Sequence, residues 1–92
     1  MPSYQSLAVT AQHLNTTESV LMDMRRFDWI STVEKNGTTF LSMHQEYKVK
    51  FILHLRTRFH LSDEEIALVM NSQEAPYSLK KVSEILGREL LA

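Results

Sequence analysis

Residues 17–41 read TESVLMDMRRFDWISTVEKNGTTFL and residues 42–66 read SMHQEYKVKFILHLRTRFHLSDEEI, and these two stretches decide the fold. In order they contain a short helix, an apolar Trp29-Ile30 pair, a turn at Asn36-Gly37, and a long helix that begins after Ser42. A second capped helix start follows at Ser62. A helix, a tight hairpin and a further helix in this order are typical of a small winged helix-turn-helix domain.

Two short helices are expected on either side of a polar break. Ser3 is positioned to cap a helix that runs to about Leu14, with apolar residues at helical spacing. Asn15-Thr16-Thr17 interrupts this pattern, and Thr17 is the expected cap of a second helix, Glu18 to Phe27. Two short helices joined by a tight polar turn indicate a helix-turn-helix.

The Asn36-Gly37 pair predicts a tight hairpin, because both residues readily adopt the positive φ that such a turn requires. Val33 precedes the turn, and the β-prone residues Thr38 to Leu41 return the chain. The segment from Glu34 to Leu41 is the predicted wing. The predicted fold class is mostly α, a winged helix-turn-helix with a short two-stranded wing and a C-terminal helix.

Two further helix starts have the capping-box pattern, in which a serine is followed three residues later by Gln or Glu. The first, Ser42 with Gln45, opens a helix that is expected to run to about Phe59. Because its apolar residues do not keep to one stripe, it is predicted to be the central element. The second, Ser62 with Glu65, opens a helix through Ile66, Val69 and Met70.

A last helix is predicted after the loop Asn71–Pro76, with Ser78 as its cap. Residues 1–75 are expected to form the winged helix-turn-helix domain, and residues 76–92 a helix for packing or dimerisation. A chain this small gains stability by burying the apolar stripe of that helix, either on its own core or on a second copy. We expect a compact dimer or a monomer with the helix folded back, with a preference for the dimer. The stripe consists of Leu79, Val82, Leu86 and Leu90.

Composition excludes several classes of function. Ten Lys and Arg against eleven Asp and Glu give a net charge of −1, which does not favour phosphate neutralisation, although basic residues on one face would still allow DNA binding. With no cysteine, scattered histidines and only two glycines, the chain has no pattern for a metal site, a cofactor loop or a catalytic nucleophile, so we predict a non-enzyme. The start of the chain lacks signal-peptide features and no apolar run approaches a bilayer-spanning length, so a cytoplasmic protein without membrane contact is expected.

The stretch from Thr17 to Met70 resembles the MerR superfamily of winged helix-turn-helix proteins in the order of its elements. The resemblance implies a DNA-binding protein whose recognition helix is Glu18 to Phe27. Residues 55–70, LRTRFHLSDEEIALVM, also look like the corresponding segment of the CbpM-type chaperone modulators, which share a MerR-like fold but bind a J-domain co-chaperone. Small excisionases, which use a similar winged helix to bend DNA, are a third relative.

Seven residues are the predicted DNA contacts, at the start of the recognition helix, at its end and at the wing tip. Hydroxyl groups bond phosphates or bases, and arginines on a recognition helix contact the duplex. Each group also has an ordinary interpretation: a capping cluster, basic residues favoured by the helix dipole at a C-terminus, and a solvated turn. The predicted contacts are Thr16, Thr17, Ser19, Arg25, Arg26, Lys35 and Asn36.

The leading prediction is therefore sequence-specific binding of double-stranded DNA, as a transcriptional regulator or an excisionase-like factor. The alternative is a protein-interaction module of the chaperone-modulator kind, which modulates a co-chaperone or another protein. Winged helices usually read DNA, which favours the first. The sequence Met22-Asp23-Met24 replaces the family's basic residue and tyrosine pair, and Thr38-Thr39 replaces the aromatic-arginine pair after the wing glycine, which favours the second.

Overall fold

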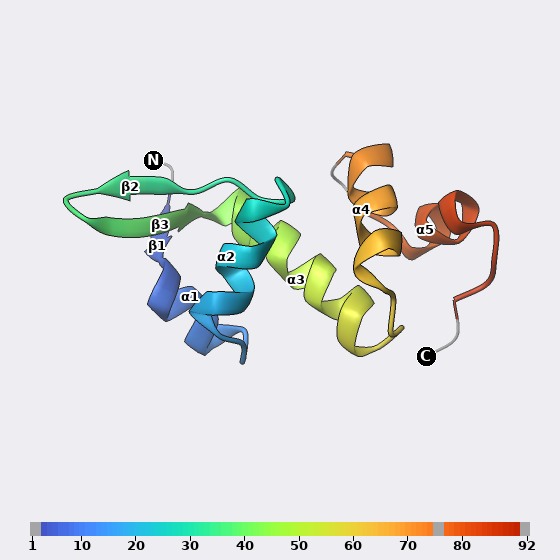
Figure 1. The fold of residues 1–92 in the computed structure, drawn as a ribbon, viewed down its shortest axis with the longest axis horizontal. Helices are drawn as coiled ribbons and strands as arrows, with labels where there is room; N and C mark the ends of the chain where they lie inside the picture. Colours follow the sequence, from blue (N-terminus) through green and yellow to red (C-terminus); the bar gives the residue numbers. More distant parts are fainter. Residues whose placement is uncertain (1–2, 75–76, 91–92) are drawn as a thin grey trace. The chain divides into compact units, whose positions relative to one another are not determined.

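A computed structural model describes residues 3–74 and 77–90 of the chain. Helix makes up most of the described residues, as the sequence predicts, and a small antiparallel sheet accompanies it (Figure 1). In chain order the elements are β1 (Tyr4–Ser6), α1 (Leu7–His13), α2 (Glu18–Arg26), β2 (Val33–Lys35), β3 (Thr38–Ser42), α3 (Met43–Thr57), α4 (Asp63–Ser72) and α5 (Leu79–Leu86).

The chain divides into two compact units, Met1–Lys50 and Phe51–Ala92. The division falls inside α3, whereas the sequence analysis placed a domain boundary between residues 75 and 76. The last helix, α5, contacts α4, and both lie in the second unit. The C-terminal helix therefore belongs to the same compact unit as α4.

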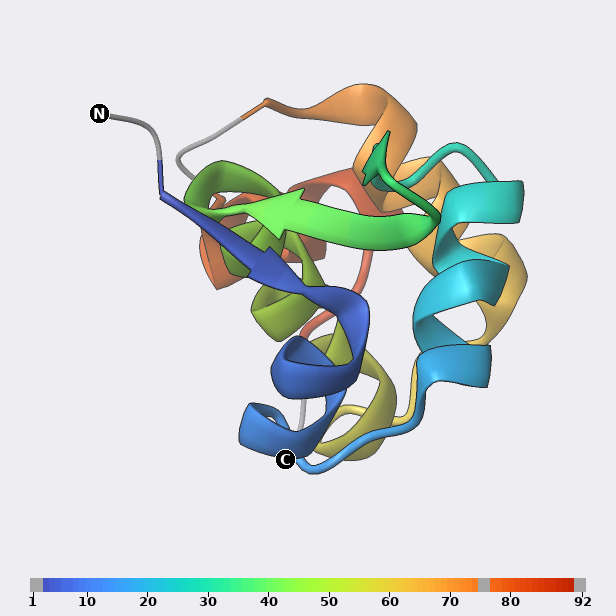
Figure 2. The ribbon, with the colours of Figure 1, turned by 90° about the vertical axis from the view of Figure 1, so that its left-hand side faces the viewer.

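The first unit is built on a three-stranded sheet in the order β1-β3-β2, with both pairs antiparallel. Figure 2 shows β1 running beside β3 and leading straight into α1. The predicted helix start at Ser3 is wrong, because Tyr4–Ser6 pair with Phe40–Ser42 as a strand and α1 begins only at Leu7. Ser6 is the cap, and its Oγ accepts a hydrogen bond from the N–H of Val9 at 3.2 Å.

Helices α1 and α2 contact each other and are joined by the polar turn that the sequence predicts. The Thr17 cap of α2 is confirmed, since Thr17 Oγ1 accepts from the N–H of Val20 at 3.2 Å. Both helices end in a left-handed residue, Asn15 (φ 56°) after α1 and Asp28 (φ 62°) after α2. Asparagine and aspartate tolerate this conformation better than other non-glycine residues, and it turns the chain sharply away from the helix.

The predicted hairpin is confirmed. Lys35 pairs with Thr38 across a two-residue turn, in which Asn36 has φ 52° and Gly37 has φ 78°. Positive φ at both central residues matches the right-handed twist of the strands. The sheet nevertheless has three strands rather than the two expected, because β1 pairs with the other edge of β3.

The capping box expected at Ser42 forms only in part. Ser42 Oγ accepts from the N–H of Gln45 at 3.3 Å. The Gln45 side chain does not return to Ser42, because its Oε1 accepts instead from the N–H of Ser31 at 2.9 Å. This hydrogen bond links the loop after α2 to the first turn of α3. Helix α3 ends at Thr57, slightly before the predicted end at Phe59.

In the second unit, the capping box at Ser62 and Glu65 is confirmed in both directions, with distances of 3.2 and 3.0 Å. Ser78 caps α5 as predicted, and its Oγ accepts from the N–H of Lys81 at 3.2 Å. Helix α4 runs on through Ser72, beyond the predicted start of the loop, and part of that loop lies outside the described residues. Helix α5 ends before Gly87, whose φ of 68° is left-handed, so the helix does not reach Leu90.

The buried apolar side chains come from every helix and from β3. In the first unit they include Leu21 and Met24 of α2, the Trp29-Ile30 pair, and Leu41 of β3. Both members of the apolar pair that the sequence singles out are 4% exposed. In α3, the fully buried residues Val49, Ile52 and Leu55 follow one another every three residues, and Phe51 and Leu53 on other sides of the helix are half-buried.

Candidate functional site

The start of α2 holds three of the predicted DNA contacts, and two of them are used by the fold itself. Thr17 is engaged as the helix cap. Thr16 is half-buried, and its N–H donates to the carbonyl oxygen of Ala11 at 2.9 Å. Ser19 is exposed. Because the Thr17 hydroxyl already accepts a backbone hydrogen bond, the capping interpretation describes this cluster better than a ready set of base contacts does.

The end of α2 holds the two predicted arginines, and they differ in their surroundings. The Arg26 guanidinium lies 3.1 Å from the Asp23 carboxylate, one helical turn earlier, and both side chains are exposed. Arg25 is exposed and makes no ion pair within the described residues. To contact a phosphate, Arg26 would have to give up its ion pair with Asp23. Arg26 is therefore a weaker candidate for a DNA contact than Arg25.

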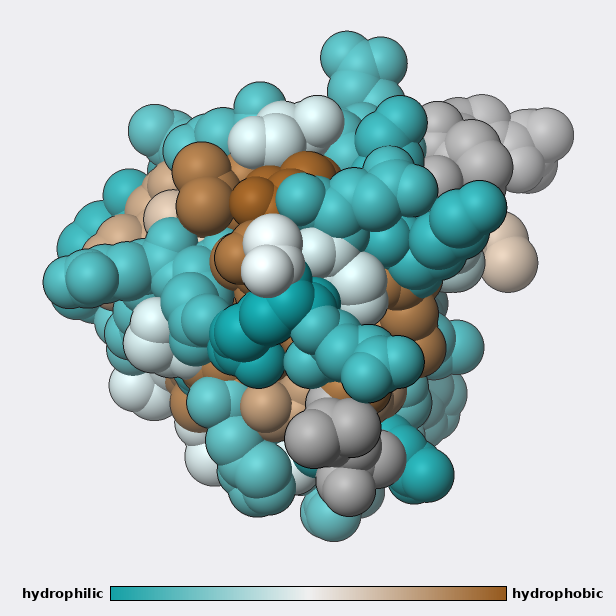
Figure 3. Space-filling view, turned by 90° about the vertical axis from the view of Figure 1, so that its right-hand side faces the viewer, coloured by the Kyte–Doolittle hydropathy of each residue, from teal (hydrophilic) through white to brown (hydrophobic). Residues whose placement is uncertain are grey.

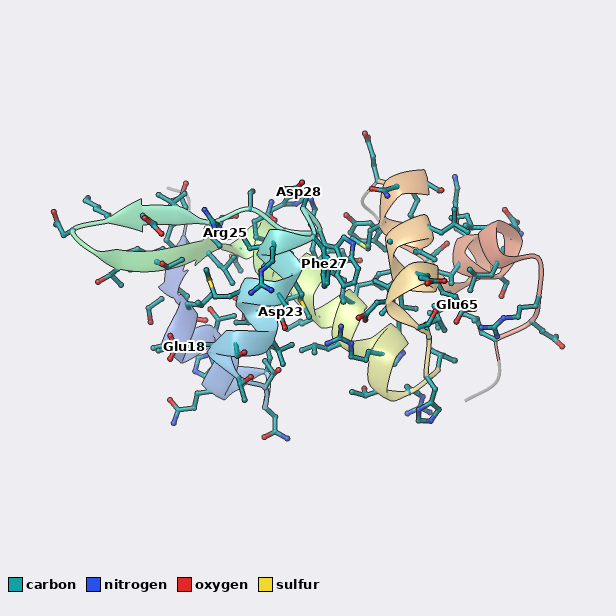
Figure 4. The ribbon with its side chains drawn as sticks, in the orientation of Figure 1. Glu18, Asp23, Arg25, Phe27, Asp28 and Glu65 are labelled. Atoms are coloured by element: carbon teal, nitrogen blue, oxygen red, sulfur yellow. The ribbon has the colours of Figure 1, made fainter. Side chains whose placement is uncertain are left out.

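Acidic side chains share this helix with the arginines. Glu18 lies in the first turn, Asp23 in the middle, and Asp28 directly after the end, and Figure 4 shows all three together with Arg25 and Phe27. Three carboxylates and two guanidinium groups give these residues a net charge of −1. We call this surface the α2 face, and it consists of Glu18, Asp23, Arg25, Arg26, Phe27 and Asp28.

The aromatic member of the α2 face is Phe27, which is 48% exposed. Its ring centroid lies 4.9 Å from that of buried Trp29, with 35° between the ring planes. Packing on Trp29 holds an apolar side chain in place at the surface. The predicted helix included Phe27, whereas α2 ends at Arg26 and Phe27 is its C-cap.

The wing tip carries the last two predicted contacts, Lys35 and Asn36, and both are exposed. Asn36 is also the left-handed residue of the turn, so its backbone role alone explains its identity. The structure brings all seven predicted contacts into the first unit. It does not give them a common basic surface, because the α2 face carries a net negative charge.

Two further cationic groups, outside the predicted contacts, are held by carboxylates of the second unit. Arg56 Nη2 lies 2.8 Å from Asp63 Oδ1, and Arg88 Nη2 lies 2.6 Å from Glu65 Oε2. The Arg88 guanidinium and the Ser62 N–H hold the pKa of the Glu65 carboxyl below its ordinary value. Both pairs lie near the start of α4, where carboxylates also interact favourably with the helix dipole. We therefore assign them a structural role.

The four residues of the predicted dimerisation stripe differ in how deeply they are buried. Val82 is fully buried within the chain, Leu86 and Leu90 are half-buried, and Leu79 is 37% exposed. In the space-filling view of the face that carries α5, hydrophilic residues cover most of the surface (Figure 3). Val82 is thus inaccessible to a second copy, and of the four residues Leu79 is the one most open to contact.

Two kinds of site are not found in the part of the chain that the structure describes. Across residues 3–74 and 77–90, no three His, Asp or Glu side chains gather in a way that would hold a metal ion. In the same ranges, no helix is both long enough and apolar enough to cross a membrane.

Comparison with known proteins gives no match, since neither a family model, nor a curated protein, nor a solved structure is significantly similar to this chain.

Proposed function

We propose that the first unit is a winged helix-turn-helix used as a protein-interaction module, and that the α2 face binds a partner protein with a basic surface. The helix pair α1 and α2, followed by the β2–β3 hairpin, supports the winged-helix assignment. The observation that carries the function is the set of three carboxylates along α2 and just beyond its end, Glu18, Asp23 and Asp28, which outnumber the two arginines of the helix. The proposal involves no catalysis and no cofactor.

The charges of the α2 face favour a protein over DNA. Binding to a duplex depends on cations that neutralise phosphates, and a carboxylate in the same contact repels them. Glu18 lies in the first turn of α2, where a recognition helix usually meets base edges. A basic protein surface, in contrast, complements Glu18 and Asp28, and leaves Arg26 in its pair with Asp23.

Phe27 supplies the apolar contact that such an interface needs. Interface affinity is concentrated in a few residues, and aromatic anchors surrounded by polar groups are typical among them. The contact with the Trp29 ring limits the motion of Phe27, so little conformational entropy is lost when a partner covers it. The resemblance to chaperone modulators supplies a specific candidate partner, a J-domain co-chaperone.

Titration calorimetry of the full chain with the J-domain of a co-chaperone from the same organism tests the proposal. We expect saturable binding that Phe27→Ala weakens at least about tenfold, as is usual for an aromatic anchor. Glu18→Lys and Asp23→Lys should each lower the affinity for the J-domain. This loss of affinity should grow as the salt concentration falls, because like charges then repel over a longer range. Glu84→Lys, which reverses an exposed carboxylate on α5, is the matched control and should bind like the parent.

DNA binding is the second candidate, and the exposed cations Arg25 and Lys35 favour it, since neither makes an ion pair within the described residues. Fluorescence anisotropy with a labelled duplex from the region upstream of the chain's own gene tests it. DNA binding predicts affinity that falls steeply with salt and a loss of about tenfold or more for Arg25→Ala with Arg26→Ala. Binding to the duplex with no response to the J-domain would overturn the protein-interaction proposal.

A further inference from the structure

The outer face of the three-stranded sheet carries three large apolar or aromatic residues, Tyr4, Val33 and Phe40, among polar ones. Alternate residues of a strand point to opposite faces, and the register pairs Val33 with Phe40 and Tyr4 with Ser42. Tyr4, Val33, Lys35 and Phe40 therefore share one face. Leu41 points to the other face and is 1% exposed, so that face is the one packed on the core.

These four residues line a pocket of about 400 Å³. Its volume lies within the range of about 300–1,000 Å³ that is usual for ligand sites. Tyr4 is 50% exposed and Val33 is 49% exposed, so the pocket is a shallow depression that is open to solvent. Such a depression suits one apolar side chain of a peptide better than a small molecule, which needs most of its surface enclosed.

The edge of the sheet beside this pocket is available for another strand. In the sheet order β1-β3-β2, strand β2 pairs with β3 on one side, and no strand of the described residues pairs with its other side. An edge strand presents backbone N–H and C=O groups that an extended peptide can pair with. Side chains of an added strand would lie opposite those of β2 at the usual cross-strand spacing.

The chemistry of β2 specifies the added strand. Val33 and Lys35 are two residues apart and both line the pocket, whereas Glu34 points to the opposite face. Lys35 is the charged member of the four lining residues. An apolar side chain opposite Val33 fills the depression, and a carboxylate two residues away meets the Lys35 ammonium group.

We propose that the β2 edge and this pocket form a docking site for an extended segment of a partner protein, with an apolar residue and an acidic residue two positions apart. The segment adds to the sheet as a fourth strand. The site includes none of the residues of the α2 face, so this proposal can be tested independently of the proposed function.

The test uses the ¹⁵N-labelled full chain and the capped peptide Glu-Thr-Phe-Thr-Glu, followed by NMR. The peptide reads the same in both directions, so it serves for a parallel or an antiparallel strand. We expect saturable shifts at the amides of β2 and at Tyr4 and Phe40, with a dissociation constant on the order of 1 mM. The peptide Lys-Thr-Phe-Thr-Lys should bind about tenfold more weakly because of its like charge.

Lys35→Glu should reverse this preference between the two peptides, because it changes the charge at the pocket and keeps an exposed strand position. Lys80→Glu, which reverses an exposed lysine on α5, is the matched control and should keep the preference of the parent. Equal binding of both peptides, the absence of saturable shifts, or shifts confined to α2 would each overturn the proposal. Unchanged amide dispersion in the variants verifies that they remain folded.

Discussion

The backbone N–H of Trp29 donates to the carbonyl oxygen of Met24 at 3.0 Å, and this bond closes the end of α2. The N–H of Asp28 donates to the carbonyl oxygen of Arg25 at 3.0 Å, and the two bonds together form a Schellman motif. Both Trp29 and Met24 are buried, as the apolar contact of this motif requires. The geometry of the helix end thus directs Trp29 inward and leaves Phe27 at the surface.

Replacing Asp28 by glycine should stabilise the chain. Asp28 holds a φ of 62°, a left-handed conformation that costs free energy for any residue with a Cβ and little for glycine. We expect Asp28→Gly to raise the free energy of unfolding by about 0.5–1 kcal/mol, measured by urea denaturation. Asp28→Ala, which keeps the Cβ, is the control and should not be stabilising. A loss of stability in both variants would mean that the aspartate side chain, rather than the backbone, matters here.

Trp29 should be the most costly residue of the first unit to truncate. Trp29 is 4% exposed, and replacing a buried tryptophan by alanine usually costs about 3–5 kcal/mol. That is a large fraction of the stability of a small domain. Phe27→Ala is the control, because Phe27 is 48% exposed and should lose only about 1 kcal/mol with the ring contact. Thermal unfolding measured by circular dichroism compares them, and a Trp29→Ala variant that melts like the parent contradicts the assignment.

Local hydrogen-bonding chemistry is what made much of this fold predictable from sequence. Thr17, Ser62 and Ser78 cap helices because their hydroxyl groups reach a backbone N–H three residues later, a relationship contained within four residues. The Asn36-Gly37 turn is equally local, since these residue types supply the positive φ themselves.

The errors arose where distant segments or competing local signals decide the structure. Tyr4–Ser6 form a strand because β3, far along the chain, pairs with them, and the cap of the first helix is Ser6 rather than the predicted Ser3. Gln45 fits a capping box by sequence, but its side-chain oxygen accepts a hydrogen bond from the N–H of Ser31 instead. The predicted stripe of the last helix extends to Leu90, whereas the left-handed φ of Gly87 ends that helix earlier.

The same distinction between local and long-range determinants applies to the candidate sites. The mixture of Glu18, Asp23 and the arginines on one helix is visible in the sequence, and the Asp23–Arg26 pair follows from their three-residue spacing. The pocket at Tyr4 and Phe40 required the pairing of β1 with β3, so the missed first strand also concealed the pocket.

The stability of the second unit should depend on the Glu65–Arg88 pair in the acid range. The pKa of Glu65 is lowered in the native state, first by the Arg88 guanidinium and then by the Ser62 N–H. The native state therefore binds its proton less readily than the unfolded chain does. The resulting stabilisation is complete above the unfolded pKa, and it is lost as the pH falls through the lower native pKa.

Arg88→Ala should remove the larger cause of this shift. We expect Arg88→Ala to be less stable than the parent near neutral pH, and the difference to shrink in acid as Glu65 becomes protonated. Arg58→Ala, at an exposed position, is the control, and its free energy of unfolding should depend on pH in the same way as that of the parent. Urea denaturation over this pH series measures the effect, and a difference between Arg88→Ala and the parent that persists unchanged into acid would contradict it.

The last prediction concerns the assembly of the chain. The sequence favoured a dimer through the stripe of α5, but Val82 is fully buried within the chain, Leu86 and Leu90 are half-buried, and Leu79 is 37% exposed. Stable dimers usually bury about 1,200 Å² or more in total, and one exposed leucine contributes a small part of that area. We now expect sedimentation equilibrium to give a monomer. Leu79→Asp should sediment and melt like the parent, whereas Val82→Asp should unfold the second unit, because it buries an unpaired carboxylate. A parent dimer that Leu79→Asp converts to a monomer without loss of structure would instead restore the dimerisation role of α5.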